Sequence, residues 1–147
     1  MNKMKSPPRS RRMATLALAA VCFTPVARLS AETVALIGNT LPERFQHDGW
    51  LETLAQREFK DQGLVFRNMA FPGDQVAKRP RNKGFTSPED YLKHIKADRI
   101  WVFFGYNESF AGKAGVAQFK TDLGGMVDKY RALKPNGKSA PKIVLFS

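Results

Sequence analysis

Val34-Ala35-Leu36-Ile37-Gly38-Asn39-Thr40 is the stretch of sequence from which the expected fold follows. Four apolar residues run into a glycine, and such a run is typical of a strand that is buried on both faces of a parallel sheet. Gly38 allows a sharp turn, and Pro42 stands where the first turn of a helix would begin. We therefore expect Asn39 and Thr40 at the carboxyl end of a strand, where ligands bind in open α/β sheets.

The rest of the chain alternates strand patterns with helix patterns. Strands are expected at 33–37, 64–70, 99–104 and 142–147, and helices at 41–59 (interrupted near Asp48-Gly49), 88–96 and 116–133. Ser87 and Pro88 are typical of a helix start, and Trp101, Phe103 and Phe104 are expected in the core. This order predicts an α/β fold with a parallel sheet and right-handed crossovers.

The chain stops on the apolar strand 142–147, whose outer face would need a covering element. We therefore expect the α/β domain, residues 32–147, to be incomplete at its carboxyl end or to be completed by a partner.

Residues 1–31 resemble a targeting segment. A basic stretch, Met1 to Arg12, precedes an apolar run from Met13 to Phe23, which is too short to span a bilayer. The sequence therefore predicts a signal peptide, export to the periplasm or medium, and no stable membrane insertion after cleavage. An uncleaved anchor or a misread start codon is the alternative. Cys22 lies inside this segment, so the mature domain would hold no thiol for disulfides or catalysis.

The net charge of +11 is concentrated in the same leader. Six basic and no acidic residues precede Glu32, so residues 32–147 carry 18 basic and 13 acidic side chains, a net +5. A modest excess of this kind is typical of a solvated surface, and nucleic acid is not an expected partner. The sequence also lacks a P-loop, a dinucleotide fingerprint and a cluster with metal-ligand spacing, so no cofactor and no metal are expected.

Each of the first three expected strands ends in a glycine with polar neighbours: Gly38-Asn39-Thr40, Phe71-Pro72-Gly73-Asp74 and Gly105-Tyr106-Asn107-Glu108. Acyl transfer needs a hydroxyl nucleophile at a tight turn and donors that stabilise the oxyanion, typically backbone N–H groups and an Asn side chain. The three turns together contain these groups.

On these motifs the chain resembles the SGNH/GDSL hydrolase superfamily over residues 33–147, and within it a subgroup of exported proteins from planctomycete-type bacteria. The resemblance implies a flavodoxin-like three-layer α/β/α fold and hydrolysis of acyl or acetyl esters, often on carbohydrate. It implies Thr40 as the nucleophile, with Gly73 and Asn107 in the oxyanion hole. Asn39, Asp74 and Glu108 are expected to contact a small-molecule or glycan ester.

The sequence departs from the family pattern at two points. Thr40 stands in place of the family's serine, and its methyl group restricts χ1. The Asp-x-x-His block is absent, and without a base the hydroxyl remains protonated. We therefore expect little activity from these 147 residues, with a non-catalytic binding or scaffold module as the alternative. The two histidines, His47 and His94, are expected on helices away from the site.

Other roles are open for the same residues. Thr40 is also a suitable N-cap for the following helix, and Gly73 a simple turn glycine. Asn107 is equally suited to holding its loop, and Glu108 to pairing with Arg44 or Lys113. The basic stretch 78–83 is either solvated or in contact with an anionic ligand.

Overall fold

The computed structural model describes residues 31–80 and 84–146, so residues 1–30 of the predicted leader, with Cys22, lie outside the described residues, as do residues 81–83 and 147. The strands are β1 (Thr33–Gly38), β2 (Val65–Asn68), β3 (Arg99–Phe103) and β4 (Lys142–Leu145). The helices are α1 (Thr40–Asp48), α2 (Trp50–Glu58), α3 (Pro88–His94) and α4 (Gly112–Leu133), with short 3₁₀ turns at Lys60–Gln62 and Glu108–Ala111.

The four strands form one parallel sheet in the order β2-β1-β3-β4. The chain moves outward to β2 in one direction and to β3 and β4 in the other, so the strand order reverses between β1 and β3. In doubly wound sheets, ligands bind in the crevice outside the carboxyl ends of the strands at this point. In the β1–β3 register Gly38 lies opposite Phe103, which places the ends of both strands together.

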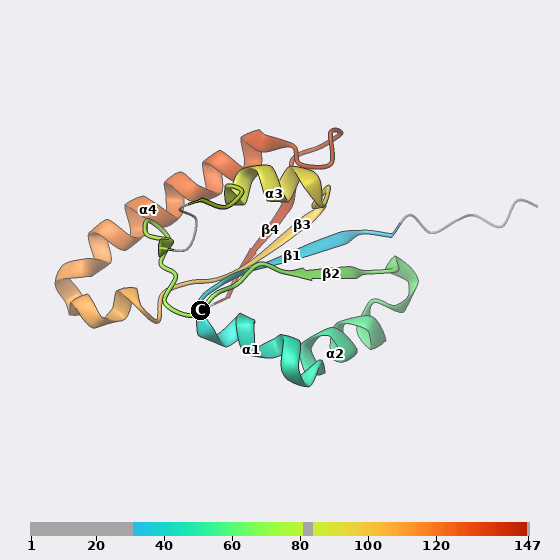
Figure 1. The fold of residues 1–147 in the computed structure, drawn as a ribbon, viewed down its shortest axis with the longest axis horizontal. Helices are drawn as coiled ribbons and strands as arrows, with labels where there is room; N and C mark the ends of the chain where they lie inside the picture. Colours follow the sequence, from blue (N-terminus) through green and yellow to red (C-terminus); the bar gives the residue numbers. More distant parts are fainter. Residues whose placement is uncertain (1–30, 81–83, 147) are drawn as a thin grey trace, which may run out of the picture.

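Helices cover both faces of the sheet, so the domain has three layers (Figure 1). Side chains of β1 and β3 alternate between the two faces. One core lies beneath α1 and α2 and contains Val34, Leu36, Ala55, Leu64, Phe66, Trp101 and Phe103. The other lies beneath α3 and α4 and contains Ala35, Ile37, Leu92, Ala97, Ile100, Val102, Phe104, Met126 and Tyr130. The expected α/β/α fold and the expected core positions of strand 99–104 are confirmed.

The helix boundaries follow local chemistry. Ser87 caps α3 by accepting a hydrogen bond from the Asp90 N–H at 3.1 Å, with Pro88 in the first turn, as the sequence indicates. The single interrupted helix expected over 41–59 is two helices. The break lies at Gly49, whose φ of +65° ends α1 in the left-handed conformation.

Strand β4 lies at the edge of the sheet, and its apolar side chains are incompletely covered. Val144 is 41% exposed and Leu145 50% exposed. On the α1 side, Phe146 stacks on Phe103 with ring centroids 4.2 Å apart. Among the described residues, no helix is long and apolar enough to cross a membrane.

Candidate functional site

The first turn of the site depends on a glycine that packs against β3. Gly38 ends β1 with φ of +153°. A Cβ atom there would lie 2.6 Å from the Phe103 carbonyl oxygen and 2.8 Å from a side-chain atom of Pro42. Such contacts are too short for a methyl group, so only glycine lets the chain leave β1 this close to β3. This close approach sets the position of the next two residues.

Asn39, and not Thr40, caps α1. The Asn39 side-chain oxygen accepts from the Leu41 N–H at 3.4 Å, and its carbonyl accepts from the Glu43 N–H at 3.3 Å. The residue is 2% exposed. Thr40 is therefore the first residue of the helix and is exposed, so the interpretation of Thr40 as the cap is wrong. Both residue types cap helices well, and only the three-dimensional structure decides between neighbours.

The second turn is bonded to the first. The Phe71 N–H donates to the Gly38 carbonyl at 3.2 Å, and the Asn68 amide donates to the Pro42 carbonyl at 2.6 Å. Gly73 has φ of +87° within a turn that the Asp74 N–H closes on the Phe71 carbonyl at 3.2 Å. A positive φ at this position suits glycine. The turn is thus held directly beside the end of β1.

The third turn is bonded to the second through two side chains. The Asn107 amide nitrogen donates to the Asp74 carbonyl at 3.0 Å. The Glu108 carboxylate accepts from the Val76 N–H at 2.8 Å and from the Gly105 N–H at 2.9 Å. Glu108 therefore holds two loops together, and the alternative role of pairing with Arg44 or Lys113 is wrong. The three motifs lie at one edge of the sheet in a continuous hydrogen-bonded arrangement.

A cavity of about 680 Å³ opens beside these turns, on the α3 side of the sheet. Most of its wall is apolar or aromatic. The full lining is Ile37, Gly38, Asn68, Met69, Phe71, Asp74, Arg79, Phe85, Thr86, Pro88, Tyr91 and Phe104. Of the residues expected at the site, Asp74 lines this cavity and is only 4% exposed. Thr40, Gly73 and Asn107 lie outside its lining, and Gly38 joins the cavity to the turn that carries Thr40.

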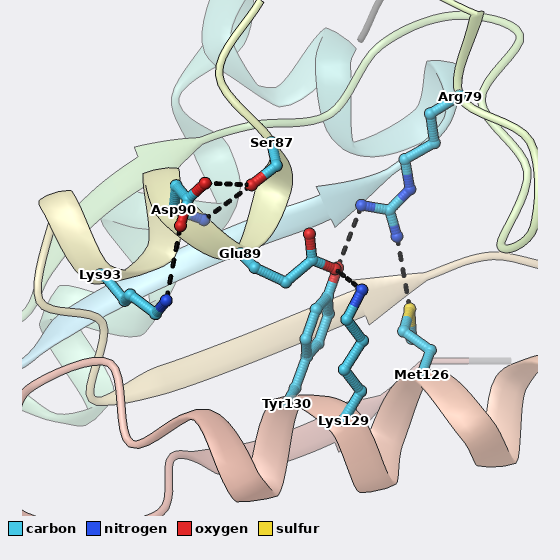
Figure 2. Close-up of polar contacts among 8 residues, drawn as sticks. All are labelled: Arg79, Ser87, Glu89, Asp90, Lys93, Met126, Lys129 and Tyr130. Atoms are coloured by element: carbon cyan, nitrogen blue, oxygen red, sulfur yellow. Dashed lines mark hydrogen bonds and ion pairs between the residues drawn. The ribbon is translucent and has the colours of Figure 1, made fainter.

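Arg79 connects the cavity wall to helix α4. Its guanidinium donates to the Tyr130 hydroxyl at 3.0 Å and to the Met126 sulfur at 3.4 Å (Figure 2). Burial raises the pKa of Tyr130, and the charge of Arg79 offsets part of this effect. The basic stretch 78–83 is visible in the sequence, but nothing there distinguishes Arg79 from its neighbours, because its partners are 47 and 51 residues away.

An ion pair lies next to this arrangement. Lys129 contacts Glu89 at 2.8 Å (Figure 2). Burial on its own would raise the pKa of Glu89, but the hydrogen bond from Lys129, a backbone hydrogen bond and the charge of Lys129 together outweigh it, with a smaller contribution from Arg79. The pKa of Glu89 therefore lies below its ordinary value of 4.5. The same hydrogen bond raises the pKa of Lys129.

The two histidines lie on helices. His47 is exposed, seven residues after Thr40 on α1, which corresponds to about 10 Å along the helix axis. It contacts Glu43 at 3.4 Å. His94 ends α3 and lies against Tyr91, with ring centroids 5.9 Å apart. Within residues 31–80 and 84–146, no group of three His, Cys, Asp or Glu side chains is placed to hold a metal ion.

No protein-family model and no curated protein sequence matches this chain. Solved structures are similar to it. The crystal structure of TesA matches with a TM-score of 0.55 and 24% identity, over 78% of this chain and 59% of that one. A candidate GDSL-like lipase from Parabacteroides merdae ATCC 43184 matches with a TM-score of 0.57 and 13% identity, over 80% of this chain and 61% of that one.

The chain therefore spans less than two thirds of the length of either structure. The likeness shows an SGNH/GDSL hydrolase-like fold, as the sequence resemblance implied.

Proposed function

We propose that the chain is the nucleophile-bearing part of an SGNH-type ester hydrolase, with Thr40 as the nucleophile. The observation that carries this proposal is the position of Thr40. It is exposed at the first residue of α1, directly after β1, and Asn39 performs the capping role that would otherwise explain a threonine there. A hydroxyl at the start of a nine-residue helix also benefits from the positive end of the helix dipole when negative charge develops beside it.

The oxyanion hole in this proposal consists of the backbone N–H groups of Thr40 and Gly73 together with the Asn107 amide. Three neighbouring donors of this kind are what acyl transfer requires. An Asn amide has two N–H groups, and the hydrogen bond from Asn107 to the Asp74 carbonyl uses one of them. The second remains for an oxyanion, while the first fixes the orientation of the amide.

The general base in this proposal is an Asp-x-x-His block outside these 147 residues. The positions of His47 and His94 on exposed parts of α1 and α3 support this view, because neither lies among the three turns. A threonine hydroxyl without a base stays protonated and is a weak nucleophile. The 147-residue chain alone is therefore expected to hydrolyse even activated esters slowly or not at all.

The substrate in this proposal is an acyl or acetyl ester, including esters on carbohydrate, encountered after export to the periplasm or medium. Of the three expected substrate contacts, Asp74 lies in the cavity lining, but it is 4% exposed and so offers little surface to a ligand. Asn39 and Glu108 instead stabilise the turns, because the side chain of each accepts hydrogen bonds from backbone N–H groups there.

The test is hydrolysis of 4-nitrophenyl acetate by the protein produced from the complete gene, compared with its Thr40→Ala and Thr40→Ser variants. We expect Thr40→Ala to abolish turnover. Thr40→Ser should raise turnover by roughly two- to thirteenfold, because relieving a crowded χ1 is worth about 0.5–1.5 kcal/mol. Equal turnover by the Thr40→Ala variant would refute the nucleophile. Rapid turnover by the 147-residue chain would refute the claim that the general base lies outside these residues.

A non-catalytic SGNH-like binding or scaffold module is the second candidate. The placement of both histidines favours it, since the described turns then form a pocket without a base. The two candidates separate in the same assay. A module of this kind binds ligands in the cavity but shows no hydrolysis above the uncatalysed rate in any form of the protein.

A further inference from the structure

The guanidinium of Arg79 is held in the cavity wall by groups that do not neutralise it. It donates to the Tyr130 hydroxyl and the Met126 sulfur (Figure 2). The guanidinium carbon lies 5.1 Å from the centre of the Phe104 ring. A hydroxyl, a thioether and an aromatic face orient a cation without carrying a full negative charge. Of the five N–H groups of a guanidinium, these two hydrogen bonds occupy two.

The nearby carboxylates do not complete an ion pair with Arg79. Within residues 31–80 and 84–146, no carboxylate oxygen lies within 4.0 Å of its nitrogens. Residues 1–30 and 81–83 contain no Asp or Glu. Glu89 is close enough for Arg79 to lower its pKa, but it bonds Lys129 at 2.8 Å. Asp74 lines the same cavity and is 4% exposed, so it offers little surface to a ligand.

The rest of the cavity wall suits an apolar body. Four aromatic side chains surround the space: Phe71, Phe85, Tyr91 and Phe104. A volume of about 680 Å³ lies within the range of small-molecule sites. In such surroundings a hydrogen bond between a guanidinium and an anion is stronger than in water. The combination favours a ligand with an apolar or aromatic part and one negative group.

We propose that this cavity binds a small amphipathic organic anion and that Arg79 selects for its charge. The guanidinium would bind a carboxylate or a similar group, while the aromatic wall covers the apolar part. As a statement about substrate recognition this rests on the hydrolase proposed above, but ligand binding itself does not. A purely structural role, in which Arg79 only attaches its loop to α4, predicts no preference between charged and neutral ligands.

The test compares two probes of nearly the same shape, 4-phenylbutyrate and 4-phenylbutyramide, by isothermal titration calorimetry at pH 7. We expect the wild-type chain to bind the carboxylate roughly tenfold or more tightly than the amide, in line with a charge-assisted hydrogen bond. Arg79→Met should remove this preference, and Arg79→Lys should retain part of it. Lys78→Met is the matched control, because Lys78 is exposed on the same loop and does not line the cavity.

Tyr130→Phe separates recognition from attachment of the loop. It removes the hydroxyl that holds Arg79 but keeps the cation, so the variant should still prefer the carboxylate. Equal affinity of the wild type for both probes, no binding of either, or a preference that survives in Arg79→Met would overturn the proposal. Because the wild-type comparison needs no variant, the test holds even where Arg79→Met fails to fold. A charge preference together with no ester hydrolysis by the product of the complete gene supports this site and refutes the hydrolase, and hydrolysis by that product without a charge preference does the reverse.

Discussion

Replacing Gly38 by alanine tests whether close packing at the end of β1 determines the geometry of the site. The added Cβ would lie 2.6 Å from the Phe103 carbonyl oxygen and 2.9 Å from the Phe103 Cβ, both on the paired strand. Overpacking of this kind costs about 1–3 kcal/mol, and an L-residue at positive φ adds about 1–2 kcal/mol. We therefore expect a loss of about 2–5 kcal/mol in the free energy of unfolding, a large part of the stability of an ordinary domain.

The assay is urea unfolding followed by far-UV circular dichroism. Gly124→Ala is the matched control, because Gly124 is exposed on α4 and a Cβ there meets nothing within 4 Å. Removing a glycine from a helix interior should stabilise the protein by about 0.5–1 kcal/mol. The same added methyl group should thus have opposite effects at the two positions. An unchanged midpoint for Gly38→Ala, or an equal loss for Gly124→Ala, would refute the packing argument.

Further predictions concern the helix caps, the ion pair and the sheet edge. Asn39→Ala should lower the free energy of unfolding by about 1 kcal/mol, because α1 loses its cap; chemical denaturation measures this, and no loss would mean that the cap is not formed. The pKa of Glu89 is lower in the folded state, so its ion pair stabilises the fold above pH 4.5 and is lost as pH falls below it. Glu89→Gln should therefore cost up to about 1 kcal/mol at pH 7 and nothing near pH 2, and a pH-independent cost would contradict the assignment. Leu145→Lys on the edge strand should leave the stability unchanged and lower any self-association measured by analytical ultracentrifugation, because Leu145 is 50% exposed; a clear loss of stability would contradict this exposure.

The sequence was sufficient to predict the architecture where local chemistry and tertiary structure agree. The apolar run before Gly38 predicts β1 because a strand covered on both faces needs such a run. The pattern Ser87-Pro88 predicts the start of α3 because both residues act within one turn. The alternation of strands and helices then determines the layers, and the ends of parallel strands determine the edge where the three motifs meet.

Other features depend on contacts that no local pattern encodes. Asn39 caps α1 in preference to Thr40 because α1 begins at Thr40, one residue before the helix start expected at position 41. Glu108 bonds the Val76 N–H from 32 residues away. Phe85 and Tyr91 line the cavity, but Phe85 lies in a loop and Tyr91 on the short helix α3, so neither belongs to the strand ends from which the site was predicted. These positions are set by the tertiary fold, so spacing along the sequence could not identify them.

The central claim, that Thr40 is the nucleophile, is tested most directly by covalent labelling. The protein would be incubated with an alkyl fluorophosphonate, which forms a stable bond to an activated hydroxyl, and its peptides would be analysed by mass spectrometry. We expect an adduct at position 40, formed slowly by the 147-residue chain and faster by the Thr40→Ser variant. An unlabelled Thr40 in the product of the complete gene, or an adduct on another hydroxyl, would contradict it.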